Sequence, residues 1–346
     1  MLILAGGRGE RFWPWSTPAR PKQLLPLASG GRTLLAATIE RAAALVPLDH
    51  IVVLTARDLV DAVRAESPAP VVVIGEPVGR NTAPAIGAAA VWFAARSPEA
   101  SFAVMPSDHA IDDAAAFAGD LGRAFEYSER EAALLTFGIP PTGPDTNFGY
   151  IKRGQRAGER LYRVAQFTEK PDRATAEGYL ATGLYSWNSG IFVWRARVFL
   201  DALEASRPAL AGPLRALAKA TRGPGFDARW DEAFPKLESI SVDYAVLETS
   251  PHVFVMEASF DWDDLGSWGA WARRQPRDGD GNVLHGDAVA VGCRRCVVVG
   301  EGGTAAAMGL EDMVVVHVNG STLTCRLDQT DQVRKVNEAV RARRGA

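Results

Sequence analysis

Cysteines, lysines and long apolar stretches are scarce in this chain of 346 residues. Its three cysteines, Cys293, Cys296 and Cys325, are too few for a disulfide-stapled fold and favour a reducing compartment. No stretch is apolar over the length that a bilayer requires, and the start of the chain lacks the basic and apolar regions of a secretion signal. We therefore expect a cytoplasmic protein with no membrane partner.

The chain also lacks an excess of charge of either sign. Its 38 lysines and arginines nearly balance 41 acidic residues, for a net charge of -3. This balance gives no electrostatic reason to expect a nucleic acid partner, so any polyanion should be bound locally. Few of the basic residues are lysines, and most are arginines. A position that has lysine instead, such as Lys22, therefore suggests a site that requires a compact point charge.

The most informative segment lies near the start of the chain. The apolar run 2–5 is bounded by glycine and fits a buried parallel strand. Glycines allow several backbone amides to point at phosphate oxygens, and nearby cations add full charges. The segment supplies both: Gly6, Gly7, Gly9, Arg8, Arg11 and Lys22. We interpret it as a nucleoside triphosphate site, although it matches neither the P-loop nor the dinucleotide fingerprint. The alternative is a strand-to-helix turn with surface arginines.

Strand and helix patterns alternate over the first 140 residues or so. Strands are expected at 2–5, 51–55, 71–75, 102–105 and 133–139, and helices at 34–45, 58–65, 83–95 and 113–129. The alternation predicts an α/β fold with a Rossmann-like, doubly wound sheet that binds ligands at the carboxyl ends of its strands. Further on, runs at 148–153, 161–169 and 189–194, with helices near 173–181 and 197–205, favour antiparallel strands. We expect these to form a lid over the sheet edge.

A turn cluster at 277–282 marks a change in character. Beyond it, short β-rich runs are separated by glycines and followed by a helix near 331–343. We therefore predict a domain over 1–276 and a smaller β-rich domain over 277–346. Cys293 and Cys296 are separated by two residues within this region, but without a second pair nearby we expect structural thiols rather than a zinc site.

Two aspartates are candidate metal ligands. Asp108 follows the fourth predicted strand, at the edge where such a sheet presents its active site, and Asp264 lies in an aspartate-rich segment. Carboxylate oxygens of this kind suit Mg²⁺, which keeps several waters and bridges phosphates. Alternatively, Asp108 caps a helix and Asp264 is a turn residue, and Asp263 could replace its neighbour. His109 is more typical of a packed or capping residue than of a catalyst.

Eight sequence blocks, in order over almost the whole chain, resemble those of the nucleotide sugar pyrophosphorylases. They span 4–23, 76–86, 106–109, 148–151, 167–171, 187–192, 241–248 and 262–266. The Asn-Thr-Ala-Pro-Ala-Ile run at 81–86 and the Val-Asp-Tyr-Ala run at 242–245 point to the guanylyltransferase branch. Because no long C-terminal extension follows, the chain resembles the short, single-activity bacterial form of that branch. The resemblance implies a nucleotidyltransferase with a GT-A-like mixed sheet. It also implies a small left-handed β-helical domain with a terminal helix at 277–346, which we expect to mediate a homodimer.

The resemblance further implies a reaction of GTP with mannose 1-phosphate that gives GDP-mannose and pyrophosphate, assisted by Mg²⁺ on Asp108 and Asp264. Arg11 is expected to stabilise the departing pyrophosphate, and Lys22 to neutralise the α-phosphate or the attacking group. The implied nucleotide-binding residues are Ala5, Gly6, Gly7, Arg8, Gly9, Glu76, Arg80, Asn81, Thr82, Ala83, Pro106 and Ser107. The implied sugar-phosphate residues are Gly149, Tyr150, Glu169, Lys170, Asn188 and Asp243.

Other interpretations stay open. The same chemistry could act on glucose 1-phosphate or another nucleotide, or could make GDP-fucose, and a non-catalytic paralogue could sense a nucleotide sugar. A dehydrogenase is disfavoured because the loop lacks the required glycine spacing. Glu169 and Lys170 could form an exposed ion pair, Asn188 could be a turn residue, and Asp243 could cap a helix.

Overall fold

The computed structural model describes residues 1–218 and 226–344, and it divides the chain into two compact units that are each discontinuous in sequence. Unit 1 contains Met1–Gly6, Thr38–Ser107 and Ile111–Trp262. Unit 2 contains Gly7–Ala37, Asp108–Ala110 and Asp263–Ala346. None of the helices among the described residues has the length and hydropathy needed to cross a membrane.

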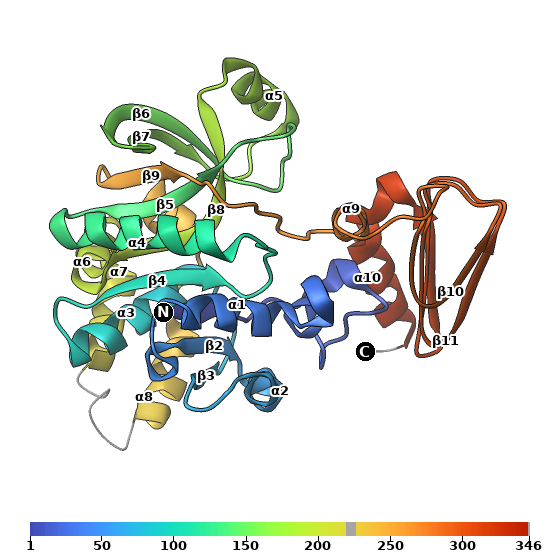
Figure 1. Cartoon of the computed structure of the whole chain (residues 1–346). Helices are drawn as coiled ribbons and strands as arrows, with labels where there is room; N and C mark the ends of the chain where they lie inside the picture. The colour runs from blue at the N-terminus through green and yellow to red at the C-terminus, as the bar shows by residue number, and fades with distance from the viewer. Residues whose placement is uncertain (219–225, 345–346) are drawn as a thin grey trace. The chain divides into compact units, whose positions relative to one another are not determined.

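Unit 1 is built, within the described residues, on a nine-stranded sheet with the order β3-β2-β1-β4-β8-β5-β9-β7-β6 (Figure 1). The strands are β1 (Leu2–Leu4), β2 (Val52–Ala56), β3 (Val72–Glu76), β4 (Ser101–Pro106), β5 (Leu134–Ile139), β6 (Tyr150–Gly158), β7 (Leu161–Thr168), β8 (Tyr185–Arg195) and β9 (Val253–Glu257). The first four strands pair in parallel, whereas β8 is antiparallel to both β4 and β5. The predicted α/β fold with a mixed sheet is therefore confirmed.

The predicted lid is wrong. Strands β6, β7 and β8 belong to the main sheet, and β8 occupies its centre between β4 and β5. The reason is the apolar run Ile191–Trp194, whose four side chains are all buried. Such a run needs cover on both faces of the sheet, which an edge or lid position does not provide.

Helices cover the sheet of unit 1. They are α2 (Val60–Glu66), α3 (Thr82–Arg96), α4 (Ala114–Arg130), α5 (Arg173–Thr182), α6 (Ala196–Ser206), α7 (Pro208–Ala218) and α8 (Phe226–Ala233), while α1 (Leu34–Ala43) begins in unit 2. Helices α7 and α8 and strand β9 were not predicted from the sequence. Helix α3 is capped by Asn81, whose side chain accepts a hydrogen bond from the Thr82 amide at 2.9 Å.

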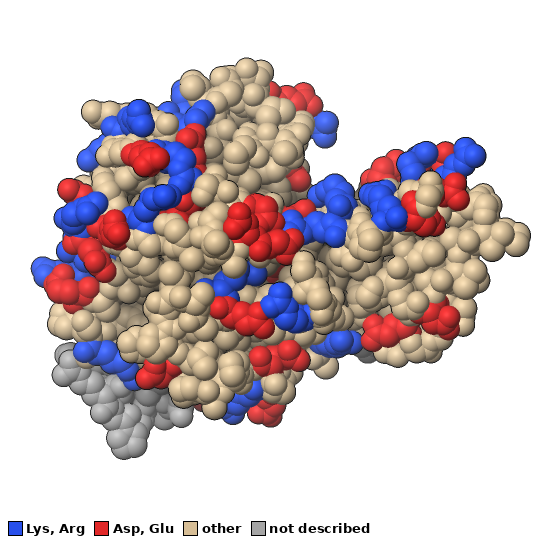
Figure 2. Space-filling view, viewed as in Figure 1, with Lys and Arg blue, Asp and Glu red and all other residues tan. Residues whose placement is uncertain are grey.

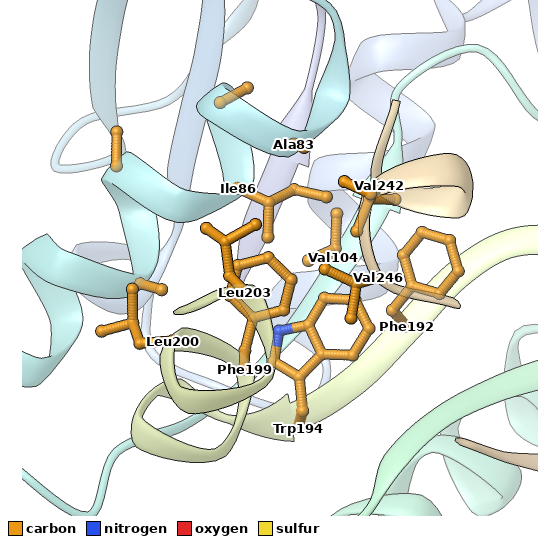
Figure 3. Packing of buried hydrophobic residues seen from close by; sticks show 14 of the residues in the cluster. Ala83, Ile86, Val104, Phe192, Trp194, Phe199, Leu200, Leu203, Val242 and Val246 are labelled. Carbon is orange, nitrogen blue, oxygen red and sulfur yellow. The ribbon is translucent and has the colours of Figure 1, made fainter. Parts of the chain in front are cut away.

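The main core of unit 1 packs α3, α6 and α7 together and against the sheet. Figure 3 shows residues of α3, α6, β4 and β8 within this core. Trp194 of β8 stacks on Phe199 of α6, with 4.9 Å between the ring centroids. A Cβ at Gly87 of α3 would come within 2.6 Å of Leu214 in α7 and 3.4 Å of Leu203 in α6. Glycine at this position therefore permits the close approach of α3 to its neighbours.

Unit 2 contains a four-stranded sheet of β10 (Val283–Val291), β11 (Val297–Met308), β12 (Met313–Val318) and β13 (Ser321–Arg326). Strands β10, β11 and β12 pair in parallel although only short links join them, and β13 returns antiparallel. The pairing of β10 with β11 also shifts register between Gly286 and Ala288. Short links between parallel neighbours, and strands that bend partway, are features of a coil of strands rather than a helix-covered sheet. The predicted β-helix-like domain is confirmed in this respect.

The core of unit 2 joins the two ends of the chain. Phe12 and Trp15 from the first loop pack with Trp268 and Trp271 of α9 (Trp268–Arg273) and with valines of β11 and β12. Helix α10 (Val333–Arg344) completes the unit and contributes Val333 to the same core. The glycine-rich loop is thus held by the C-terminal strands and helices, an arrangement that was not predicted from the sequence.

We predict that Leu203→Ala lowers the free energy of unfolding by about 2 to 5 kcal/mol, because it leaves a cavity in the core of unit 1. Urea unfolding monitored by tryptophan fluorescence measures the change. Leu184→Ala is the matched control, since Leu184 is 47% exposed and should cost less than about 0.5 kcal/mol. Equal losses in the two variants would contradict the assignment of this core.

Candidate functional site

The glycine loop of unit 2 rests directly on the segment that carries Lys22. Gly9 has a left-handed backbone, with φ of 58°, and a Cβ there would overlap the Lys22 side chain. Gln23 donates from Nε2 to the carbonyl oxygen of Gly7 at 3.0 Å. Only glycine combines this backbone conformation with such close contact, so Gly9 fixes the loop against Lys22. Gly7 and Arg8 are exposed.

The buried ammonium group of Lys22 joins the two candidate metal ligands. Its Nζ lies 2.9 Å from Asp108 Oδ2, and it also donates to the main-chain oxygen of Asp264. Burial on its own would raise the pKa of Asp108, but the charges of Lys22 and His109 more than offset this effect and hold the pKa below its usual range. His109 lies 4.0 Å from Asp108. The structure thus brings Lys22, Asp108 and Asp264 together.

Arg11 approaches the same place. A Cβ on Gly266 would lie 2.8 Å from Asp264 Oδ2 and 3.3 Å from Arg11 Nη1, so both side chains converge over this glycine. Burial, with the neighbouring charges of Asp263 and Asp108, raises the pKa of Asp264 to about 6 despite the opposing effect of Lys22. A carboxylate in this state gains from any additional cation.

The contacts of Asp263 and Asp264 differ. Asp263 Oδ1 accepts from the Leu265 amide at 2.8 Å, and its other oxygen lies 3.7 Å from Arg273. Its backbone also pairs with Ala110. Asp264 Oδ1 likewise accepts from the Gly266 amide at 3.2 Å, as a turn residue would, but its main-chain oxygen also accepts from Lys22 and its Oδ2 lies near Arg11 across Gly266. Leu265 carries φ of 45°, which is rare for a bulky residue and marks a constrained turn. This geometry favours Asp264 over Asp263 as a ligand.

In unit 1, Glu76 ends β3 and lies beside Gly6, where a Cβ would be 3.8 Å from Glu76 Oε2. Burial raises the pKa of Glu76 to about 7. The Ala5 amide already donates to Leu54 in the sheet at 2.7 Å, which leaves Gly6 as the first exposed position after β1. Pro106 ends β4, and the amide of the buried Ser107 donates to the oxygen of Leu4 at 3.0 Å.

The predicted segment from Arg80 to Ala83 is tied to residues much later in the chain. Arg80 donates to the oxygen of Pro235, and the Ala83 amide donates to the oxygen of Ile240 at 3.1 Å. Thr82 accepts from the Val242 amide at 2.8 Å. Asn81 has φ of 64°, so the start of α3 is held in an unusual conformation.

Five of the six predicted sugar-phosphate residues converge in unit 1: Gly149, Glu169, Lys170, Asn188 and Asp243. Asn188 donates from Nδ2 to Asp243 Oδ1 at 3.0 Å, and its amide donates to the oxygen of Gly149 at 2.8 Å. A Cβ on Gly149 would lie 2.6 Å from Glu169 Oε2, so this glycine leaves room for the carboxylate. Lys170 lies 2.8 Å from Glu169.

The charges of this cluster perturb one another. Burial, reinforced by Glu169, raises the pKa of Asp243 above its usual range. Burial opposes the charge on Lys170, but its contacts with Glu169 prevail and raise its pKa. The sixth residue, Tyr150, is fully buried, and its hydroxyl donates to the oxygen of Asp145 at 3.0 Å. The cluster therefore offers acidic and amide groups of the kind that bind vicinal hydroxyls.

Three supporting residues were not identified as functional from the sequence. Gln23 holds the glycine loop, Thr136 donates to Asn188 Oδ1 at 2.8 Å, and Glu248 accepts from the Glu169 amide at 3.0 Å. Gln23 and Glu248 lie inside two of the eight sequence blocks, so the resemblance could have identified them as functional. Thr136 lies in an ordinary buried strand, and nothing in its neighbourhood in sequence marks it.

The cysteine pair of unit 2 is packed in an apolar cluster. Cys293 and Cys296 are buried with Val298, Ala305 and Ala307. Asn282 bonds to the backbone of both cysteines, at 3.0 Å and 2.9 Å.

On the face drawn in Figure 2, basic and acidic side chains are interspersed, in keeping with the small net charge.

We predict that the free energy of unfolding falls as the pH rises from about 4.5 to 7, because the folded chain holds the Glu76 proton more tightly than the unfolded chain. The contribution of this one group is at most about 3 kcal/mol. Glu76→Gln should remove that part of the fall and make the protein more stable than the parent at pH 8. Urea unfolding at four pH values tests this, with exposed Glu129→Gln as control. Parallel pH profiles for parent and Glu76→Gln would contradict it.

Two family models match the chain. The nucleotidyl transferase model matches residues 1–278, and the MannoseP isomerase/GMP-like beta-helix domain matches residues 286–339. The xanthan biosynthesis protein XanB of Xanthomonas campestris pv. campestris (strain B100) is 39% identical, over 99% of this chain and 73% of that protein. A mannose-1-phosphate guanylyltransferase of Escherichia coli is 36% identical, over 97% of this chain and 73% of that protein.

A solved structure extends the likeness to three dimensions. The crystal structure described as mannose-1-phosphate geranyltransferase from Thermus thermophilus has a TM-score of 0.87 and 34% identity, and the match covers 98% of both chains. The resemblance inferred from the eight sequence blocks is confirmed. The chain belongs to the nucleotidyl transferase family, in the branch of the mannose-1-phosphate guanylyltransferases.

Proposed function

We propose that the protein transfers a guanylyl group from GTP to mannose 1-phosphate, giving GDP-mannose and pyrophosphate. The observation that carries this proposal is the cluster of Lys22, Asp108, Asp264 and Arg11 in unit 2, the charge arrangement that phosphoryl chemistry requires. The choice of base and sugar is supported by relatives named mannose-1-phosphate guanylyltransferase at 36% identity over nearly the whole chain.

The proposed reaction needs no general base. A phosphate monoester has a second pKa of about 6, so its oxygen is already a competent nucleophile at neutral pH. The difficulty is repulsion between two polyanions, with charge building on the α-phosphate and the leaving pyrophosphate. Fixed cations and in-line positioning then provide the catalysis. This agrees with a site built from a lysine, an arginine and carboxylates rather than a histidine or serine nucleophile.

We assign separate roles to the two cations. The ammonium of Lys22 lies 2.9 Å from Asp108, a proposed metal ligand. We assign to Lys22 the neutralisation of the α-phosphate or of the attacking phosphate oxygen. Arg11, with the amides of Gly7 to Gly9, stabilises the departing pyrophosphate. Gly9 and Gln23 keep the loop in the conformation that presents those amides.

The carboxylates of Asp108 and Asp264 fit a magnesium ion. Both supply oxygen donors, Lys22 donates to the Asp108 carboxylate and to the main-chain oxygen of Asp264, and the charge of Asp108 helps raise the pKa of Asp264. Mg²⁺ accepts one or two carboxylates and completes its shell with water and substrate phosphates. When bound, it would polarise the α-phosphate and offset its charge.

We further propose that unit 1 supplies the selective contacts. Glu76, Gly6, Pro106, Ser107 and the start of α3 would bind the nucleotide, and Glu76 can accept from a base when ionised. The cluster of Gly149, Glu169, Lys170, Asn188 and Asp243 would bind the sugar phosphate, with Lys170 toward its phosphate. The division into a catalytic part over 1–276 and a dimerising part over 277–346, and a cytoplasmic location in keeping with the free thiols, are also proposals.

We expect GTP with mannose 1-phosphate to give the highest kcat/KM in a panel of GTP, ATP, UTP and dTTP against mannose 1-phosphate and glucose 1-phosphate. A missing or misplaced polar contact costs a site of this kind about 10-fold or more. A coupled pyrophosphate assay measures the rates. A clear preference for UTP or dTTP would overturn the proposed nucleotide, and binding without turnover of any pair would favour a sensing paralogue.

We expect Asp108→Asn and Asp264→Asn each to lower kcat by about 100-fold or more, because a metal-held α-phosphate loses several kcal/mol of transition-state stabilisation. Nucleotide binding, measured by calorimetry, should largely persist. Asp263→Asn is the matched control and should stay close to the parent, since an asparagine oxygen can still accept from the Leu265 amide. EDTA should abolish turnover and Mg²⁺ should restore it. An unaffected rate in Asp108→Asn would contradict the metal role.

A further inference from the structure

Three consecutive residues of the first loop, Glu10, Arg11 and Phe12, form one turn of 3-10 helix. Because this helix has three residues per turn, successive side chains point in three different directions. Phe12 is buried against Trp268, with 5.2 Å between ring centroids, and Arg11 points toward Gly266 and Asp264. Glu10 points in the third direction, and the proposed reaction assigns no role to it.

Glu10 is held by two arginines of the C-terminal helix α10. Its Oε1 lies 2.8 Å from Arg341 Nη1, and its Oε2 lies 3.4 Å from Arg334 Nε. The two arginines are two helical turns apart and share one face of α10. The Glu10 side chain is only 23% exposed, so water screens these pairs less than fully exposed ones.

The same loop is anchored again beyond Arg11. Trp15 donates from its ring nitrogen to Glu301 of β11 and stacks on Trp268, with 5.7 Å between ring centroids. Trp268 in turn donates to the oxygen of Trp13 at 3.3 Å. Arg11 therefore projects from a turn that is held on both sides of Arg11 in sequence, by α10 through Glu10 and by β11 and α9 through Trp15 and Trp13.

We propose that Glu10 is a positioning residue for Arg11, and that Arg334 and Arg341 of α10 hold Glu10 for this purpose. The proposal rests on the proposed function, in which Arg11 stabilises the leaving pyrophosphate. An arginine side chain has many rotamers, so a rigid turn beneath it sets where its guanidinium stands in the transition state. The C-terminal helix thus takes part in the reaction through the orientation of a residue 330 positions earlier than Arg341.

The test is a double-mutant cycle on the full chain. Glu10→Gln should lower kcat about 5- to 50-fold with little change in the KM for mannose 1-phosphate, since small misplacements of catalytic groups cost up to about 100-fold. Arg341→Gln should act in the same direction, and Arg341→Lys should recover part of the loss. In the Arg11→Ala background, Glu10→Gln should cause no further loss, because the two residues act as one.

Arg343→Gln is the matched control, because Arg343 is exposed on the same helix and the variant removes the same charge. It should leave kcat unchanged. Thermal unfolding and light scattering should show an intact fold and an unaltered oligomeric state in Glu10→Gln and Arg341→Gln. If Glu10→Gln fails to fold, Arg341→Gln carries the same cycle.

Two results overturn the inference alone: an unchanged kcat in both Glu10→Gln and Arg341→Gln while Arg11→Ala is slow, or an equal loss from Glu10→Gln with and without Arg11. The second result would indicate a general structural role. If Arg11→Ala itself keeps the parent rate, the proposed role of Arg11 fails and the inference fails with it.

Discussion

The contact on which the candidate phosphate site depends is the buried ammonium of Lys22, which reaches both the Asp108 carboxylate and the main-chain oxygen of Asp264. Three segments far apart in sequence meet at this one charge. Without it, two carboxylates would lie close together in a half-buried place and repel each other. The ammonium also explains the glycine loop, because Gly9 can rest against Lys22 only in the absence of a side chain.

The sugar-phosphate cluster of unit 1 repeats this arrangement with different residues. Lys170 accompanies Glu169 and Asp243, as Lys22 accompanies Asp108 and Asp264, and in each group burial raises the pKa of one acid. The backbone has a positive φ at Lys170, in the first group, and at Leu265, the residue after Asp264 of the second group. Strain of this kind persists only where the surroundings fix the chain, so both groups are held in place before a ligand arrives.

Much of this could be predicted from the sequence because the signals are local. Apolar runs located most strands of the sheet, and their alternation with helical patterns predicted the α/β fold. The position of β8 could not be predicted, since its partners β4 and β5 are about 90 and 50 residues earlier and only packing selects them. Strand β9 is short, and it follows closely on Asp243, where a helix could begin. It was therefore not predicted as a strand.

For the candidate site, the sequence identified which residues matter more readily than what supports them. Lys22, Asp108 and Asp264 stand in recognisable blocks. By contrast, the Lys22 contact with Asp264 uses a backbone oxygen, which any residue has, and Glu10 meets Arg341 across 331 positions. Contacts of these two kinds leave no local pattern. Residues that accept from or donate to a catalytic neighbour therefore need the fold to be recognised.

The reversal of β13 makes the two edges of the small sheet unlike. The β10 edge belongs to the coil of parallel strands, whereas the β13 edge belongs to an antiparallel hairpin. A second copy that paired at β13 would extend the hairpin, whereas one that paired at β10 would extend the coil of parallel strands, so the two edges are not equivalent as sites of association. Pairing of β10 with β10 of a second copy would be isologous, and an assembly of that kind closes at two.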